Sequence, residues 1–296
     1  MTVLALPAIG LVLAAVLAGM AWQHLRYLNL RRRAVQDRQP MLYGRRTFHV
    51  LTFLKAHPGE DPVAAVAKLR QTTAGGGRWI YAGKVVVNVP SARIGPADWS
   101  AVTLVQYPSR EAYERWAASE AHRVALGAFE AHYVQGARRS AAENLILPQL
   151  LLLRRLAARL RGEPSAYPFR PMPAEALPPR VHEVMARLRA DAELGRDAAV
   201  VINLQAKGDA AMRANDRRYT SPMIGLMAEL GYGPMHLAKA EMLPGGEPFD
   251  RVAIVYYPGA AFFADMVGSS FYQHILPSKQ LADNQSTITA PILNRL

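Results

Sequence analysis

Two seven-residue segments of this chain are alike and lie 150 residues apart. Val102–Pro108 reads VTLVQYP, and Val252–Pro258 reads VAIVYYP. The same offset pairs the tripeptide at Leu54–Ala56 with the tripeptide at Leu204–Ala206. Because one short match means little but a shared offset in separated segments is harder to obtain by chance, the pattern indicates an internal repeat. The chain is therefore expected to contain two related halves.

Each half shows the same order of strand-like and helix-like segments. Short runs of β-branched and aromatic residues predict strands, and capping residues before amphipathic runs predict helices. In the first half the predicted strands cover 48–56, 78–89, 100–107 and 144–147, and the predicted helices cover 61–71 and a long segment from 109. In the second half the predicted strands cover 198–205, 234–243, 251–257 and 287–293, and the predicted helices cover 210–230 and a segment from 260.

The order strand–helix–strand–strand–helix–strand is that of a ferredoxin-like unit, an antiparallel sheet with both helices on one face. The other face of each sheet would be exposed to water, and two copies in one chain can cover it for each other. The sequence therefore predicts the α+β class, with two ferredoxin-like (dimeric α/β-barrel) repeats packed sheet to sheet.

Composition limits the kinds of site that the chain can carry. Its 296 residues suffice for about two domains, and 51% of them are hydrophobic, which suits packed globular material. The sequence contains no cysteine, which excludes structural disulfides, thiolate metal sites and a cysteine nucleophile. The absence of cysteine also fits a reducing compartment.

An uncharged segment, 3–22, precedes the repeats. As a helix its 20 residues would span ~30 Å, the thickness of the hydrocarbon core of a bilayer. Trp22 and Tyr27 lie where an interfacial aromatic belt would lie. A cleaved signal peptide would need positive charge before the apolar run, and a buried core helix would usually carry a polar face. We therefore expect one transmembrane helix ahead of the repeats.

Arginines are concentrated directly after this segment, in a chain of net charge +12. Seven of them lie between Arg26 and Arg46, and no Lys or Arg precedes the segment. The positive-inside rule then places the N-terminus outside and the body in the cytoplasm. Arginines beside an apolar helix favour contact with anionic lipid, so nucleic acid is not expected as a partner. The candidates for lipid contact are Trp22, Tyr27, Arg31, Arg32 and Arg33.

The middle of the chain differs from both halves. The segment 145–160 has an apolar body and an arginine face, typical either of an interfacial helix or of a helix packed on the body. The segment 162–179 carries six prolines and predicts a linker, and 180–194 predicts an amphipathic helix. The expected regions are a transmembrane anchor at 1–25, a basic juxtamembrane segment at 26–46, the first repeat at 47–149, an arginine-rich helix with a proline-rich linker at 150–196, and the second repeat at 197–296.

Two segments of the first half resemble a known family: GGRWIYAGKV at Gly76–Val85 and LVQYPSREAYERWAASEAHR at Leu104–Arg123. They are similar to bacterial proteins of domain-of-unknown-function family thirteen-thirty, within the dimeric α/β-barrel superfamily. The second half, with YYPGAAFFADMVGSSFYQ at Tyr256–Gln273, is more distant. The resemblance implies a tandem, pseudo-dimeric barrel. Relatives in the superfamily include cofactor-independent monooxygenases, haem-degrading enzymes, chlorite dismutase-like proteins and muconolactone isomerase-like enzymes, so the fold does not fix the function.

No residue pattern identifies a catalytic group, a cofactor or a metal site. The eight histidines form neither HxH nor HExxH. Aromatic residues could line a pocket between sheet and helices, although core packing is their commoner role. Lys84 and Lys239 recur in corresponding positions and could bind an anionic substrate or be solvated edge lysines. The candidates for a ligand pocket are Tyr107, Tyr113, Trp116, Lys84, Tyr257, Phe263, Lys239 and His236.

Two functional hypotheses remain from the sequence. The lack of an evident acid–base or metal constellation favours a membrane-anchored binding or accessory protein, whose barrel docks onto a larger membrane complex. The alternative is a cofactor-independent enzyme of the monooxygenase or isomerase type that acts on a hydrophobic small molecule. An enclosed pocket with converging polar groups would favour the enzyme. The expected partners are the lipid bilayer, a membrane protein complex or a hydrophobic small molecule.

Overall fold

The computed structural model describes residues 5–72, 76–95, 98–139, 141–190 and 198–296. Helix α1 (Ala5–Val35) comes first. The first half contains β1 (Phe48–Lys55), α2 (Pro62–Thr72), β2 (Arg78–Val89), β3 (Ala101–Tyr107), α3 (Arg110–Ala117), α4 (Glu120–Gly127) and β4 (Ala131–Arg138). Helices α5 (Ala141–Leu160) and α6 (Pro179–Ala190) follow. The second half contains β5 (Ala199–Ala206), α7 (Ala210–Leu230), β6 (Gly233–Glu241), β7 (Arg251–Tyr257), α8 (Ala260–Val267), α9 (Ser270–Ile275) and β8 (Asp283–Pro291).

These eight strands form one closed antiparallel barrel in the order β1-β3-β2-β8-β5-β7-β6-β4. The predicted fold, two ferredoxin-like repeats packed face to face behind a transmembrane helix, is therefore wrong. The halves join edge to edge instead, at a seam between β2 and β8 and a second seam between β4 and β6. Closure is favourable because two separate sheets would each leave edge strands with unpaired N–H and C=O groups.

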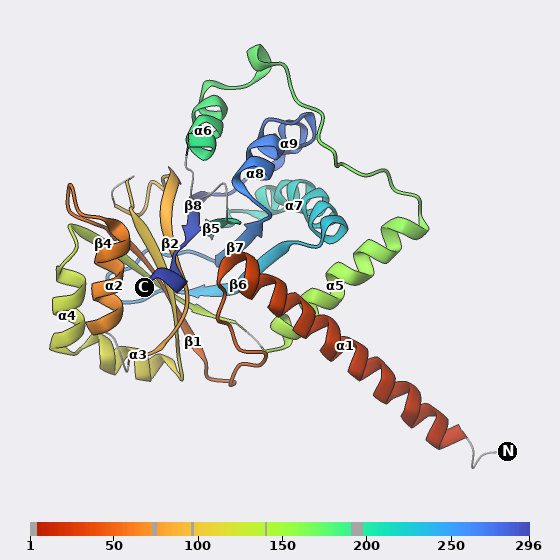
Figure 1. Ribbon diagram of the computed structural model, residues 1–296, viewed down its shortest axis with the longest axis horizontal. Helices are drawn as coiled ribbons and strands as arrows, with labels where there is room; N and C mark the ends of the chain where they lie inside the picture. Colours follow the sequence, from red (N-terminus) through yellow and green to blue (C-terminus); the bar gives the residue numbers. More distant parts are fainter. Residues whose placement is uncertain (1–4, 73–75, 96–97, 140, 191–197) are drawn as a thin grey trace.

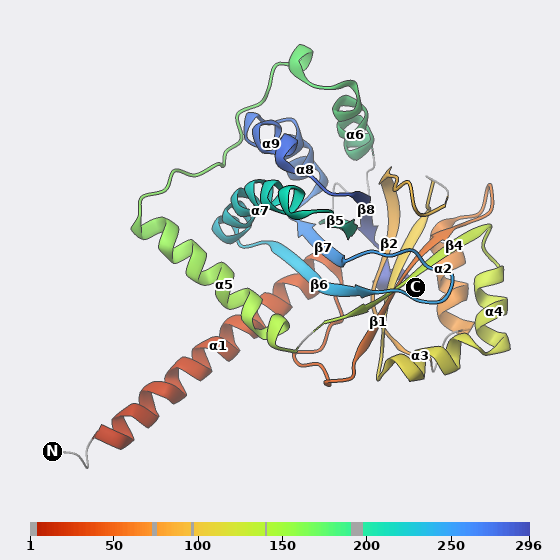
Figure 2. The same ribbon diagram turned by 180° about the vertical axis from the view of Figure 1, so that it is seen from behind.

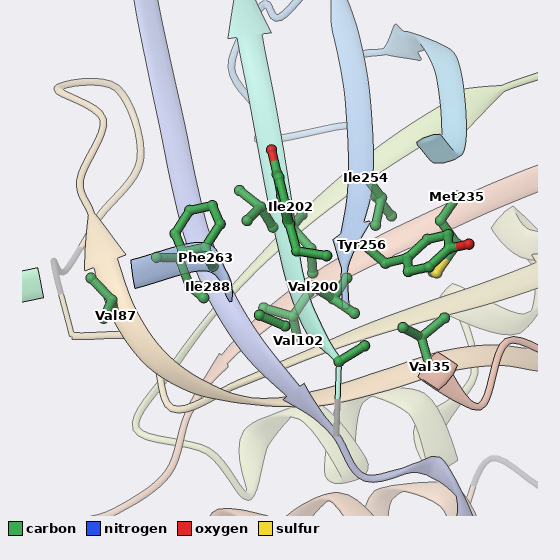
Figure 3. Packing of buried hydrophobic residues seen from close by; sticks show 14 of the residues in the cluster. Val35, Val87, Val102, Val200, Ile202, Met235, Ile254, Tyr256, Phe263 and Ile288 are labelled. Carbon is green, nitrogen blue, oxygen red and sulfur yellow. The ribbon is translucent and has the colours of Figure 1, made fainter. Parts of the chain in front are cut away.

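The helices lie on the outside of the barrel, and its core is shared by both halves. Helices α2, α3 and α4 cover one side, and α7, α8 and α9 cover the other (Figure 1). Val102 of β3 and Val200 of β5 belong to the same buried cluster as Ile202 and Ile254 (Figure 3). A core built from both halves means that neither half buries its apolar strand faces alone.

The registers of the strands correct the way the two halves were aligned. In the first half Phe48 pairs with Tyr107, and in the second Ala199 pairs with Tyr257. The tyrosines are 150 residues apart, whereas Phe48 and Ala199 are 151 apart. A slip of one residue moves a side chain to the other face of a sheet. The residue of β5 equivalent to Thr52 is consequently Asn203.

Most predicted elements lie where the sequence placed them, with two local differences in the first half. The fourth strand is β4, and the segment 144–147 belongs to helix α5 instead. The long helix predicted from 109 is divided into α3 and α4, because Ser119 leaves the helical conformation and caps α4 by accepting a hydrogen bond from His122 N. Its counterpart Ser269 caps α9 in the same way.

Helix α1 extends well beyond the predicted membrane span and away from the barrel (Figures 1 and 2). Within the part of the chain that the structure describes, no helix combines the length and the apolar character needed to cross a membrane. The predictions of a single-pass anchor, an outside N-terminus and a cytoplasmic body are corrected accordingly. The helix continues through its arginines to Val35 and packs its last turns against the barrel. Residues 3 and 4, where the predicted span begins, lie outside the described residues.

The last turns of α1 and the segment that follows, residues 24–43, form a strap across one end of the barrel. Tyr27 Oη donates a hydrogen bond of 2.8 Å to a carbonyl of β6, and Arg31 Nη1 donates one of 2.9 Å to Met235 O. Arg31 Nε lies 3.1 Å from Asp37 Oδ2, and both side chains are only 1% exposed. This ion pair lies within the strap and allows both charges to be buried against the barrel, where either charge alone would be costly.

The seam between β4 and β6 is short and depends on Gly136. A Cβ atom at this position would lie 2.5 Å from Phe48 Cζ and 2.7 Å from the backbone oxygen of Glu241. We expect Gly136→Val to lower the free energy of unfolding by about 2–3 kcal/mol in urea denaturation, because the backbone of β6 cannot move aside without losing its pairing. The control Gly127→Ala places its new methyl group in open space. Equal effects of the two substitutions would contradict a close-packed seam.

Candidate functional site

A cavity of about 330 Å³ lies in the second half, between strands β5, β7 and β8 and helices α6, α7, α8 and α9. We call it the second-half cavity. Its aromatic walls are Tyr219, Tyr257, Phe263 and Tyr272. Its aliphatic walls include Val181, Val184, Val201, Val267, Leu276 and Ile288. Its polar residues are Arg180, Asn203, Lys279, Asn284 and Ser286. The volume and the mainly apolar lining are those of a small-molecule site.

Two amide oxygens in this lining lack hydrogen-bond partners. Asn203 Oδ1 and Asn284 Oδ1 are both enclosed, and neither accepts a hydrogen bond from another described residue. Asn203 is held in place from its other side, because its Nδ2 donates a bond of 3.4 Å to Ala253 O. An enclosed polar atom without a partner costs about 1–3 kcal/mol, so a structure keeps one only where something compensates. A hydroxyl or N–H group of a bound molecule would do so.

Acid–base side chains gather at one side of the cavity. Lys279 follows the short helical turn at Leu276–Ser278, and its Nζ lies 5.6 Å from the ring centroid of Tyr219. Burial lowers the pKa of Lys279, and attraction to Asp216 opposes this shift. Burial raises the pKa of Tyr219 well above its usual value and also raises the pKa of Tyr272. The side chains of the two tyrosines interact, with ring centroids 6.1 Å apart.

Helix α6 closes the cavity from outside. It begins at Pro179, at the end of the proline-rich segment, and packs beside α8 (Figure 1). Val181 and Val184 contribute apolar wall, and Arg180 contributes a charged group at the rim. The prolines restrict the preceding chain to extended conformations and so limit where α6 can lie. The segment between the repeats is therefore part of the site as well as a connection.

The corresponding space in the first half is closed, with a volume of about 20 Å³. Tyr107 lies with its ring centroid 5.2 Å from that of Tyr113 and 5.7 Å from that of Trp116. The ring centroid of Trp116 also lies 4.1 Å from that of His122. The structure thus places these three predicted pocket residues in a packed aromatic core, and it places only Tyr257 and Phe263 of the predicted set in the second-half cavity.

The remaining pocket candidates lie elsewhere. Lys84 is on β2 opposite β8, and Lys239 is on β6 opposite Arg138 of β4, so the two lysines occupy equivalent positions at the two seams. His236 is fully buried, with its ring centroid 4.7 Å from that of His49. None of the three lines the second-half cavity.

The pair of His49 and His236 lies under the strap, in a strongly cationic environment. Neither ring nitrogen of His49 has a hydrogen-bond partner among the described residues. Burial lowers the pKa of His49 to about 3, and the charge of Arg139 contributes. Burial also lowers the pKa of His236 well below its usual value, with further contributions from His49, Arg139 and Arg31. Both rings are therefore neutral. Among the described residues no group of three or more His, Cys, Asp and Glu side chains is placed to hold a metal ion.

The candidates for lipid contact divide into two sets. Tyr27 and Arg31 are buried in the strap and face the barrel, so they cannot reach a headgroup. Trp22 is 62% exposed, and Arg32 and Arg33 are exposed as well. Helices α1 and α5 carry most of the large apolar side chains that are exposed among the described residues. The lipid bilayer and a larger complex remain predictions as partners.

Sequence reasoning missed Asn203, Tyr219, Lys279 and Asn284. Asn203 could have been found, because it is a polar residue in the middle of the apolar strand VVINLQA and strands buried on both faces rarely carry one. Tyr219 and Lys279 have no such local pattern. They come together only because α7 and the turn after α9 meet over the same strands.

Comparisons with known proteins leave the family of this chain open. No protein-family model matches the chain, and no curated protein sequence matches it. The family resemblance inferred from GGRWIYAGKV and LVQYPSREAYERWAASEAHR is therefore wrong. Among solved structures, an anthrone oxidase-like protein aligns with a TM-score of 0.45 and 10% identity, over 86% of this chain and 96% of that one. A protein from Lactobacillus acidophilus NCFM, provisionally assigned as a monooxygenase, aligns with a TM-score of 0.39 and 7% identity, over 83% and 93%.

Proposed function

We propose that this chain is an enzyme of the isomerase type, which moves a proton on a hydrophobic small molecule bound in the second-half cavity. The observation that carries the proposal is the cavity itself. Its volume of about 330 Å³ suits a small molecule, its walls are aromatic and aliphatic, and a few polar groups face one region of it. This combination favours an enzyme over the docking module that the sequence first suggested.

The polar groups favour proton transfer as the reaction. Lys279, Tyr219 and Tyr272 can each hold or release a proton, and Asp216 lies close enough to influence the pKa of Lys279. Lowering the pKa of an amine raises its unprotonated fraction, and the unprotonated amine can accept a proton from carbon. The phenols keep their protons, because burial raises their pKa values. They are suited to donate a hydrogen bond to a substrate oxygen.

Asn203 is expected to orient the substrate, and its replacement provides a test. Asn203→Leu removes an unpaired amide oxygen from an apolar wall, so the free energy of unfolding should stay within about 1 kcal/mol of the parent value or rise. Binding of a small aromatic ligand that carries a hydroxyl group, such as 2-naphthol, should weaken by about tenfold, the equivalent of one lost hydrogen bond. Fluorescence titration measures the binding, and thermal unfolding measures the stability.

Thr52→Val is the matched control, because Thr52 occupies the equivalent position in the closed first half. It should leave the affinity for 2-naphthol unchanged. If the parent protein binds no member of a panel of hydroxylated aromatic compounds, or if both substitutions weaken binding equally, the second-half cavity is not the site.

A further inference from the structure

Lys279 differs from the other lysines of the chain in its surroundings. The sequence contains six: Lys55, Lys68, Lys84, Lys207, Lys239 and Lys279. Lys55 forms ion pairs with Asp98 and Glu130, and Lys239 is exposed. Lys279 instead lines an aromatic cavity, with its Nζ over the ring of Tyr219 and no hydrogen bond or ion pair to any described residue.

We propose that Lys279 is a nucleophile that forms an imine with the carbonyl carbon of a hydrophobic aldehyde or ketone substrate. The inference rests on the proposed function, since it names a residue and a substrate class for the same cavity. A lysine reacts with a carbonyl group when its amine is uncharged and when water is excluded from the pocket. Around Nζ, burial lowers the pKa of Lys279 and so raises the fraction of uncharged amine, and aromatic and aliphatic side chains form most of the cavity wall.

The position of the side chain favours the uncharged amine. Lys279 shares the cavity with the apolar side chains of Leu276 and Ile288, and burial there lowers its pKa. Asp216 is the only carboxylate that contributes to this pKa among the described residues, and burial raises the pKa of Asp216 itself. Burial therefore favours the neutral form of both groups over the ion pair that an exposed lysine and aspartate would form.

The reaction balances with groups that the cavity already holds. The Nζ lone pair attacks the carbonyl carbon, the C=O π electrons move to the oxygen, and a proton passes from the nitrogen to that oxygen to give a carbinolamine. Protonation of the hydroxyl then releases water as the C=N bond forms. The hydroxyls of Tyr219 and Tyr272, which line the same cavity, can relay this proton while each remains a neutral phenol. An imine withdraws electrons from the adjacent carbon and makes that carbon easier to deprotonate. Deprotonation at that carbon is the step that an isomerase reaction needs.

The walls limit the kind of carbonyl compound that fits. Tyr257 and Phe263, with ring centroids 4.6 Å apart, present aromatic surface on the side facing the strands. Asn203 and Asn284 offer unpaired acceptor oxygens, which suit a hydroxyl or N–H group on the same molecule. The structure assigns the cavity to a flat, largely apolar aldehyde or ketone with one such donor.

The test is reductive trapping in the full-length protein. The protein is incubated with 2-naphthaldehyde and sodium cyanoborohydride, which reduces an imine to a stable secondary amine, and the labelled peptides are mapped by mass spectrometry. Labelling at Lys279 should exceed labelling at exposed Lys239 several-fold, because a lowered pKa raises the neutral fraction, by about tenfold for each unit. Lys279→Arg should remove this label, and Lys239→Arg should leave it unchanged.

Binding of 2-methylnaphthalene, which has the same rings but no carbonyl group, separates the two proposals. If it binds in the cavity while 2-naphthaldehyde labels Lys279 no faster than Lys239, the imine is overturned and the cavity stands as the site. If neither compound binds, both proposals fail. Mapping the parent protein needs no variant, so poor folding of Lys279→Arg would not affect the outcome.

Discussion

Replacement of Asp37 by asparagine is expected to lower the free energy of unfolding by about 3–5 kcal/mol. Asp37 is the carboxylate that faces Arg31 inside the strap, and both side chains are 1% exposed. Arg139 is also buried there, with its Nη1 2.8 Å from Gln39 Oε1. The substitution keeps the size of the side chain but leaves two enclosed guanidinium groups without a counter-charge. Urea denaturation monitored by tryptophan fluorescence gives the change.

Two further variants show whether charge is the cause. Glu183→Gln removes one carboxylate from the exposed pair with Arg187, where both side chains are more than half exposed, and should change the stability by less than about 1 kcal/mol. Arg31→Met combined with Asp37→Asn removes a buried charge along with its partner and should recover part of the loss. A loss of less than about 1 kcal/mol in Asp37→Asn alone would show that this ion pair does not stabilise the buried strap.

Acidification is expected to destabilise the protein between about pH 6.5 and pH 3 through His49. Burial lowers the pKa of His49 to about 3, whereas an unfolded chain would titrate it near 6.5. Below pH 6.5 the unfolded state therefore binds a proton that the folded state does not. The stabilisation is fully present above pH 6.5 and is lost as the pH falls through this window, at most by about 5 kcal/mol. His236, whose pKa is also lowered, acts in the same direction.

The substitution His49→Phe tests this dependence. Phenylalanine keeps a ring beside Tyr43 and His236 and carries no proton, and His49 has no hydrogen bond to lose among the described residues. The free energy of unfolding at pH 8 should change little, and its decrease toward acid pH should become shallower. His57→Phe, at an exposed position, should leave the slope as it is. A slope that His49→Phe does not alter would assign the acid sensitivity to carboxylates.

The elements of this fold were predictable where local chemistry determines them. Helix α7 was placed correctly because Asp209 caps its start and Gly231, with φ of 79°, ends it. The closed barrel was not predictable in this way. Its seams pair residues such as Gly83 and Pro291, and nothing in either segment identifies the other as its partner. The 20 uncharged residues of the N-terminal segment met the length and hydrophobicity expected of a membrane span. The described residues of α1 that are buried against the barrel come only after this segment, so the uncharged run gave no sign of them.

From the sequence, a pocket could be predicted only as a feature shared by both halves. Aromatic residues recur at equivalent positions, so the sequence indicates a pocket in each half or in neither. The difference arises from the size of individual side chains. Trp116 fills the first-half space, and the residue 150 positions later is the smaller Met266. Lys279 and Asn284, which supply the chemistry, have no counterpart among the residues that line the first-half space.

The two seams also determine when the barrel can close during synthesis. Strand β2 leaves the ribosome about 200 residues before its neighbour β8, and β4 leaves about 100 residues before β6. Until the second half arrives, β2 and β4 are the open edges of a half-formed sheet, and such edges can pair with other chains. We expect closure to be the slow step, because contacts so distant in sequence form late. Chaperones that shield strand edges should therefore raise the yield of this protein more than those that only bind apolar helices.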